Sequence, residues 1–222
     1  MLRHLLWKEF TEILRDKSIV SSISSVSLLM IMLGLTTLKY LSTHLEAFIL
    51  YMTPSIGVLV GFSLSYRFTR EKIDGTIETL LSTPLTLKEL WLSKVVGLTV
   101  LSYVISLAST LTLGLVKNVP VPMDVNTVIY LVVSVPVSIA SSIGLLGYLH
   151  YLLGMKQVQA LNYIVFFTLF ITLYFIVKEL SVKAVITHVS VTHTLTMALA
   201  ILGITYYLVS RLSEERVITS IN

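Results

Sequence analysis

The stretch RFTREKIDGTIETLLSTPLTLKELWLSK, residues 67–94, is the long polar interruption in a chain that is otherwise strongly apolar. Five of the 16 Lys and Arg residues lie in it, and uncharged apolar runs flank it on both sides. A helix needs about 20 apolar residues to cross a membrane, and both flanking runs are that long. We therefore expect two membrane helices joined by a polar loop.

The composition of the whole chain points the same way. Of the 222 residues, 55% are hydrophobic and only 13% are charged, whereas soluble domains carry about 25% charged residues. The net charge of +4 is what basic cytoplasmic loops would produce, and no basic stripe separate from the apolar runs points to nucleic acid. The chain has no Cys, which excludes disulfides and Cys-based metal sites.

Six intervals without Asp, Glu, Lys or Arg predict an all-α membrane protein with six transmembrane helices: residues 18–38, 47–66, 95–116, 127–149, 161–177 and 194–210. They define a single transmembrane domain, residues 18–210, whose cytoplasmic loop is residues 67–94. Residues 211–222 would form a cytoplasmic tail. Pro54 and Pro136 fall inside predicted spans, where we expect them to kink or interrupt the helix.

The distribution of basic residues predicts the orientation. With the N-terminus in the cytoplasm, 12 of the 16 Lys and Arg face inward, so both termini should be cytoplasmic. We expect a multi-pass protein of the cell membrane. We expect a prokaryotic source, and the chain holds only four Asn and two Gln, which favours a thermophilic one.

Residues 1–17 carry apolar side chains at helical spacing, with charged residues largely off that stripe. This pattern predicts an amphipathic helix lying in the cytoplasmic interface, anchored by Trp7 and by basic residues such as Lys8. The alternative is a cytosolic extension of the first span.

The polar stretch has its own local signals. Gly75 should end the helix that leaves the second span, because glycine accepts left-handed dihedral angles. Residues 76–82 have room for about two helical turns before Pro84 breaks the segment. Thr86 and Glu89 form a T-x-x-E capping box that starts the next helix. A short rigid helix below a membrane bundle suits docking into a groove on a partner, and a compact linker is the equally open alternative.

This stretch resembles the signature of the permeases of ABC-2 type transporters, E-x-x-x-G-T-x-E-x-L-L-x-x-P followed by E-L and a Lys. The matching positions are Glu71, Asp74, Gly75, Thr76, Glu78, Leu81, Pro84, Glu89, Leu90 and Lys94. Ser93 stands where the family pattern usually has Gly. The resemblance extends to six spans and to an N-terminal K-E-F, namely Lys8, Glu9 and Phe10.

The resemblance implies the transmembrane subunit of an ATP-driven transporter, paired with a second six-span subunit as a homo- or heterodimer and with separate ATP-binding-cassette ATPases. It implies that residues 76–82 are the coupling helix. The ATPase-coupling residues would be Glu71, Asp74, Gly75, Thr76, Ile77, Glu78, Leu81 and Pro84, with the three acids as partners for the ATPase or for nearby basic residues. Trp7, Lys8, Glu9 and Phe10 would be the interfacial anchor.

Catalysis is not expected in this chain. Its 222 residues contain no G-x-x-x-x-G-K-[ST] phosphate loop, so ATP and Mg would be bound by the partner subunit and this chain would hold no cofactor. His44, His188 and His193 lack the spacing and the carboxylates of a metal site, so we expect no metal.

We therefore expect an export-type permease working by alternating access. A pathway of Ser, Thr, Tyr and aliphatic side chains suits an amphiphilic or apolar substrate, and spans without ionisable groups disfavour proton-coupled transport. The alternatives are a haem-exporter-like subunit of cytochrome maturation and a membrane scaffold that transports nothing. A membrane enzyme is disfavoured because the spans hold no clustered carboxylates.

Overall fold

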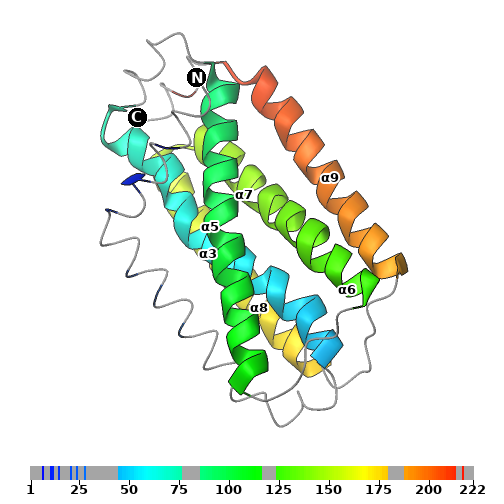
Figure 1. Ribbon diagram of the computed structural model, residues 1–222. Helices are drawn as coiled ribbons and strands as arrows, with labels where there is room; N and C mark the ends of the chain where they lie inside the picture. The colour runs from blue at the N-terminus through cyan, green and yellow to red at the C-terminus, as the bar shows by residue number, and fades with distance from the viewer. Residues whose placement is uncertain are drawn as a thin grey trace.

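The fold is a helical bundle, seen here in a computed structural model (Figure 1). The structure describes residues 45–76, 86–116, 124–179 and 188–213, together with positions 7, 11, 12, 15, 21, 24, 28 and 217. The helices in these ranges are α3 (Leu45–Ile73), α5 (Leu87–Val116), α6 (Val125–Ile129), α7 (Val135–Leu152), α8 (Met155–Glu179) and α9 (His188–Arg211), and a π-helical turn, η2 (Tyr130–Ser134), joins α6 to α7. The described residues form no strand, which confirms the all-α prediction for that part of the chain.

Helices cover the second to sixth predicted spans, but the number of spans stays a prediction. Three segments are long and apolar enough to cross a membrane by length and composition: Leu87–Thr112, Val125–Leu152 and Ser190–Arg211. The first predicted span lies outside the described residues except for Ser21, Ser24 and Leu28, which are helical and exposed. The division into domains likewise stays a prediction.

Helix α7 is the centre of the bundle, because it packs against α3, α5 and α9. Close approach to α3 depends on two glycines one helical turn apart. A Cβ atom on Gly57 would lie 2.7 Å from Ile139 Cγ1, and a Cβ on Gly61 would lie 2.7 Å from Ile143 Cγ1. Small residues at this spacing let helices approach closely in lipid, where hydrophobicity gives no driving force between them.

Hydroxyl groups line the contact between α3 and α5. Ser106 Oγ donates to the Thr53 carbonyl, and the hydroxyls of Thr53 and Thr110 lie 3.1 Å apart. All three residues are buried. Interhelical hydrogen bonds of this kind contribute to association inside a membrane, so the α3–α5 contact is polar as well as tight.

The two prolines within predicted spans behave differently. Of the two effects predicted for Pro54, the interruption does not occur, because α3 runs without a break from Leu45 to Ile73, and the kink stays a prediction. A proline removes one hydrogen bond, and packed neighbours can compensate for it within a membrane bundle. Pro136 does disturb its helix: the turn just before it, η2, is π-helical, and Val135 N–H bonds to the Tyr130 carbonyl, five residues back.

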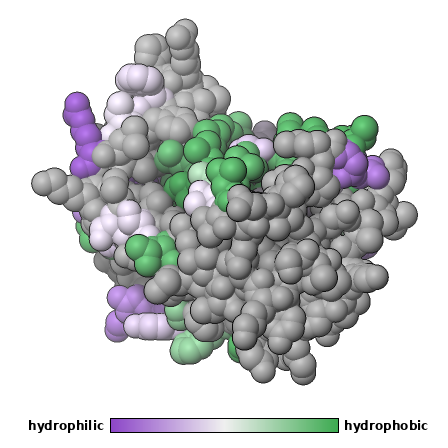
Figure 2. All heavy atoms as spheres, turned by 60° about the horizontal axis from the view of Figure 1, so that its bottom comes forward, coloured by the Kyte–Doolittle hydropathy of each residue, from purple (hydrophilic) through white to green (hydrophobic). Residues whose placement is uncertain are grey.

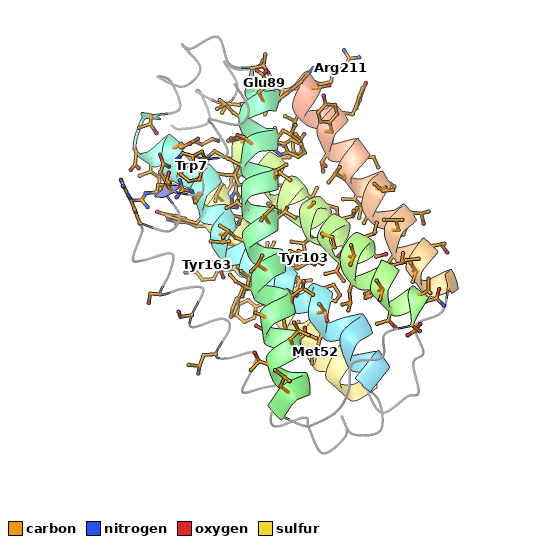
Figure 3. All side chains as sticks on the ribbon, in the orientation of Figure 1. Trp7, Met52, Glu89, Tyr103, Tyr163 and Arg211 are labelled. Atoms are coloured by element: carbon orange, nitrogen blue, oxygen red, sulfur yellow. The ribbon has the colours of Figure 1, made fainter. Side chains whose placement is uncertain are left out.

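In that widened turn the carbonyl of Leu131 loses its usual α-helical donor, because Val135 N–H bonds to the Tyr130 carbonyl instead and Pro136 has no N–H. Tyr103 on α5 supplies the missing donor, its hydroxyl lying 2.9 Å from the Leu131 carbonyl. Figure 3 shows Tyr103 along the middle of the bundle, between the ends marked by Glu89 and Met52. The interhelical bond therefore compensates for the irregularity that Pro136 imposes.

The outward faces of α8 and α9 are apolar. Exposed side chains on them include Tyr163, Ile164, Phe167, Ile171, Met197, Leu199, Ile204 and Tyr207. Figure 2 shows apolar side chains at the surface of the described residues, as expected where lipid or another membrane subunit replaces water.

Candidate functional site

The candidate site lies at the end of the bundle where α3 ends and α5 begins. The C-terminal end of α7 and Arg211, at the end of α9, lie at the same end of the bundle (Figures 1 and 3). The polar stretch recognised in the sequence joins α3 to α5 here. Of that stretch, the structure describes residues 67–76 and 86–94.

The boundaries of the stretch are as the sequence predicted. Helix α3 ends at Ile73, and Gly75 follows with a φ of 68°, in the left-handed region where a side chain would be strained. The capping box is also confirmed. The backbone N–H of Thr86 donates to Glu89 Oε2 at 3.0 Å, and the N–H of Glu89 donates to Thr86 Oγ1 at 3.3 Å, so α5 begins with its first donors satisfied.

Three of the five basic residues in the stretch are buried rather than free in solvent. The side chains of Arg67, Lys72 and Lys94 have exposed fractions of 7%, 1% and 1%. Buried cations need a paired charge or a carbonyl as a partner. Each of these three side chains has such a partner, and the three partners lie on different segments. We call Arg67, Phe68, Glu71, Lys72 and Lys94 the polar hub.

The first contact of the hub closes the base of the loop. Lys94 Nζ lies 2.8 Å from Glu71 Oε1, so an ion pair links the end of α3 to the start of α5 across the whole intervening segment. The ammonium group also lies 5.8 Å from the centre of the Phe68 ring, where the ring face attracts a cation. Glu71 is therefore engaged with a nearby basic residue, one of the two roles that the resemblance implied for it.

The second contact ties the N-terminal segment to the bundle. Arg67 on α3 forms an ion pair with Glu12, and Thr11 Oγ1 donates to the Trp7 carbonyl at 2.8 Å, an i to i−4 bond within a helical turn. Trp7 is helical and 72% exposed, as an interfacial anchor would be. The other expected anchor residues, Lys8, Glu9 and Phe10, lie outside the described residues.

The third contact reaches the junction between α7 and α8. Lys72 Nζ donates to the carbonyls of Tyr151 and Leu153 at 2.9 and 3.3 Å. Burial lowers the pKa of Lys72 to about 8, because desolvation disfavours its charged form. No pattern in the sequence announced this contact.

The remaining predicted coupling residues divide between the described and undescribed parts of the chain. Asp74 is exposed and lies 3.5 Å from Arg70 Nε, and Thr76 Oγ1 donates weakly to the Glu71 carbonyl at 3.4 Å. Ile77, Glu78, Leu81 and Pro84 lie outside the described residues, so the helix predicted at 76–82 stays a prediction. Among the described residues, no group of three His, Asp or Glu side chains could hold a metal ion.

Comparison with known proteins agrees with the signature read from the loop. The family model described as ABC-2 family transporter protein matches residues 5–156, well over half of the chain. The chain belongs to the ABC-2 family. As an ABC-2 permease it is a membrane subunit, and the family implies partnership with an ATP-binding-cassette ATPase. The comparison with curated proteins gives no match, and neither does the comparison with solved structures.

The match sets the polar hub of this ABC-2 permease in context. The matched range runs from the N-terminal segment to the start of α8. It thus includes both partners of every ion pair and hydrogen bond described above. The three hub residues missed by the sequence analysis, Arg67, Phe68 and Lys72, all lie on α3 and are buried. The helical phase of α3 could have indicated their burial, but not their partners.

Proposed function

We propose that this permease is one half of an exporter, in which ATP hydrolysis by a separate subunit drives alternating access for an amphiphilic or apolar substrate. The observation that carries the proposal is the Glu71–Lys94 ion pair, which closes the base of the α3–α5 loop beneath the bundle. A loop fixed at its base can carry force into the helices, whereas a loose linker would absorb it. The second permease subunit would complete the transport pathway.

The ion pair also suggests different roles for the acidic residues of the loop. Glu71 is held by Lys94, so the carboxylates left to meet an ATPase are Asp74, which is about half exposed, and Glu78 further along the loop. Exposed rim charges mainly steer association and fix the register of two partners. We assign that steering role to Asp74 and Glu78, and a loop-closing role to Glu71.

The substrate class follows from the helices. The three long apolar segments carry mostly hydroxyl, aromatic and aliphatic side chains, and their charged residues, Lys88, Glu89, Lys94 and Arg211, lie within the first eight residues of a segment or at its last residue. Their two histidines also lie near segment ends: His193 is exposed and His150 is buried. Charged substrates need paired charges within the membrane. An amphiphilic or apolar molecule fits such a surface best.

The test is purification of the tagged protein from its own membranes in a mild detergent, followed by mass spectrometry. We expect a stoichiometric ATPase in the intact protein, and its loss after deletion of residues 75–84. Glu78→Lys should weaken the association, whereas Val125→Lys, at the opposite end of the bundle and 72% exposed, should leave it intact. A folded intact protein that retains no ATPase under several mild conditions would favour the scaffold alternative.

A further inference from the structure

Lys72 is buried at the base of the loop and has no place in the contact with the ATPase proposed above. It lies one residue after Glu71 and two before Asp74, yet its ammonium group points to the junction of α7 and α8. Burying a lysine costs free energy, because desolvation disfavours its charged form and lowers its pKa. The burial of Lys72 therefore calls for contacts that compensate for this cost.

The junction needs the donors that Lys72 supplies. Helix α7 ends at Leu152, and Leu153 is extended, with φ −89° and ψ 146°. The last carbonyls of a helix have no partner within it. The Leu149 carbonyl accepts from Leu153 N at 3.0 Å, and the Tyr151 carbonyl accepts from Lys72. A cation at a helix C-terminus is also favoured by the helix dipole. Lys72 is thus a cap for α7 that comes from another helix.

Two further contacts join the same face of α3 to the same junction. The Phe68 ring packs edge-on against the Tyr151 ring, with centroids 5.4 Å apart. His150 Nδ1 lies 3.0 Å from the Ser65 carbonyl, and its Nε2 lies 3.2 Å from Asn162 Oδ1 on α8. Ser65, Phe68 and Lys72 follow the i, i+3, i+7 spacing of a single helix face.

The other face of α3 makes the remaining attachments of the hub. Arg67 and Glu71, at i and i+4, hold the N-terminal segment and α5. The last two turns of α3 therefore connect the base of the loop to α5 on one side and to the α7–α8 junction on the other. A rotation or shift of this helix end would move both.

We propose that Lys72 is a positioning residue for coupling, which transmits movement of the α3–α5 loop to the junction of α7 and α8. The proposal rests on the proposed function, because it assumes that an ATPase moves the loop. Without Lys72, the loop could still bind the ATPase and move, but α8 would follow it less, because, of the contacts described above, only those of Phe68 and Ser65 would remain.

The first test uses the permease alone, in nanodiscs. Hydrogen exchange of the backbone amides at 153–158 should become faster by about tenfold in Lys72→Met, because the junction loses a charge-assisted cap. Lys72→Arg, which keeps donors and charge, should restore protection. Lys156→Met serves as the control, since Lys156 is exposed and lies beside the same junction. Unchanged exchange in a folded Lys72→Met would overturn the proposal whether or not an ATPase is found.

The second test uses the complex with the co-purified ATPase. The chain has no Cys, so spin labels can be placed at chosen pairs without other changes. One pair, Ile73→Cys with Arg211→Cys, reports on the end of α3, and another, Gln157→Cys with Arg211→Cys, reports on the start of α8. Adding ATP should change both distances in the otherwise unaltered protein. In Lys72→Met the first pair should still respond in full, and the change in the second should be clearly smaller.

The outcomes separate the two proposals. If both pairs respond alike in Lys72→Met, Lys72 does not transmit the movement, and faster exchange at the junction would then reflect a structural role only. If no ATPase accompanies the intact protein, the proposed function fails, while the exchange result still decides whether Lys72 holds the junction. Should Lys72→Met not fold, Lys72→Gln, which keeps one donor group, replaces it in both tests.

Discussion

At the scale of single residues, the described part of the chain concentrates its buried charge at one end of the bundle. Glu71 and Lys94 form an ion pair there with exposed fractions of 14% and 1%. Such a pair gives little net stability over an apolar replacement, but removing one partner strands the other charge. Glu71 and Lys94 should therefore depend on each other more than on anything else nearby.

A double-mutant cycle tests that dependence. Glu71→Gln and Lys94→Met should each destabilise the protein by about 3–5 kcal/mol, because each leaves an uncompensated buried charge. The double variant should lose much less than the sum of the two. The stability of all four proteins is measured by thermal unfolding in detergent, with the loss of monodisperse protein as the signal. Additive losses of stability would show that the two residues do not interact.

The lowered pKa of Lys72 makes a second residue-scale prediction, on pH. The folded protein holds this proton with a pKa of about 8 and the unfolded chain with the ordinary value of 10.5. Between these values the unfolded state binds more protons, so stability from this group rises with pH in that window and is flat below it.

The difference between variants isolates that contribution from other titrating groups. The melting temperature of the wild-type protein, measured from pH 7 to pH 10, should rise relative to that of Lys72→Met as the pH passes about 8. Lys156→Met, which removes an exposed lysine, should follow the wild-type curve. A constant difference between wild-type protein and Lys72→Met across this range would contradict the lowered pKa.

At the scale of helices, packing depends on glycines, whose lack of a side chain lets a neighbouring helix come close. Gly57 and Gly61 receive Ile139 and Ile143 of α7, and the spacing G-x-x-x-G is visible in the sequence. This motif predicts that α3 has a face for close helix contact, but many helices could have filled it. Gly203 on α9 has nothing within 4 Å of where a Cβ would lie, so it offers a matched comparison.

Replacing these glycines by alanine should have opposite effects. Gly57→Ala would force its Cβ against Ile139, and overpacking of this kind costs about 1–3 kcal/mol. Gly203→Ala should be neutral or slightly stabilising, because alanine is the better helix former. Thermal unfolding of the two variants decides the matter. Equal melting temperatures would mean that α3 and α7 do not approach as closely as described.

The π-helical turn gives a second prediction at this scale. Tyr103→Phe removes only the hydroxyl that donates to the partly buried Leu131 carbonyl, and losing this hydrogen bond should cost about 1 kcal/mol. Tyr163→Phe is the control, because Tyr163 is 69% exposed on α8. Equal stability of the two variants would show that another group satisfies Leu131.

Sequence reasoning succeeded where the signal was local and failed where it was not. The left-handed Gly75 and the Thr86–Glu89 capping box depend on neighbours within a few residues, and both are confirmed. The contact between Lys72 and Tyr151 joins positions 79 residues apart. Nothing in the local pattern specifies which carbonyls a buried lysine will meet, since that depends on how the helices cross.

At the scale of the whole molecule, the bundle has two chemically different ends. One end carries the polar hub, Lys88 and Gln157, and the other carries Val125, next to Asp124, whose carboxylate caps α6 through Thr127. An excess of basic residues at one end predicts that this end faces the cytoplasm. The same end must face the ATPase if the loop is to reach it, so the orientation and the proposed function stand or fall together.

The absence of Cys makes that orientation directly measurable. Single substitutions Lys88→Cys, Gln157→Cys and Val125→Cys place thiols at exposed positions near the two ends of the bundle. A membrane-impermeant maleimide added to intact cells should label Val125→Cys and spare the other two, because the membrane separates the two ends. In inside-out vesicles the pattern should reverse, and permeabilised cells, where all three should react, serve as the control. Labelling of Lys88→Cys from outside intact cells would put the loop on the wrong side for a cytoplasmic ATPase and would overturn both the predicted orientation and the coupling role of the loop.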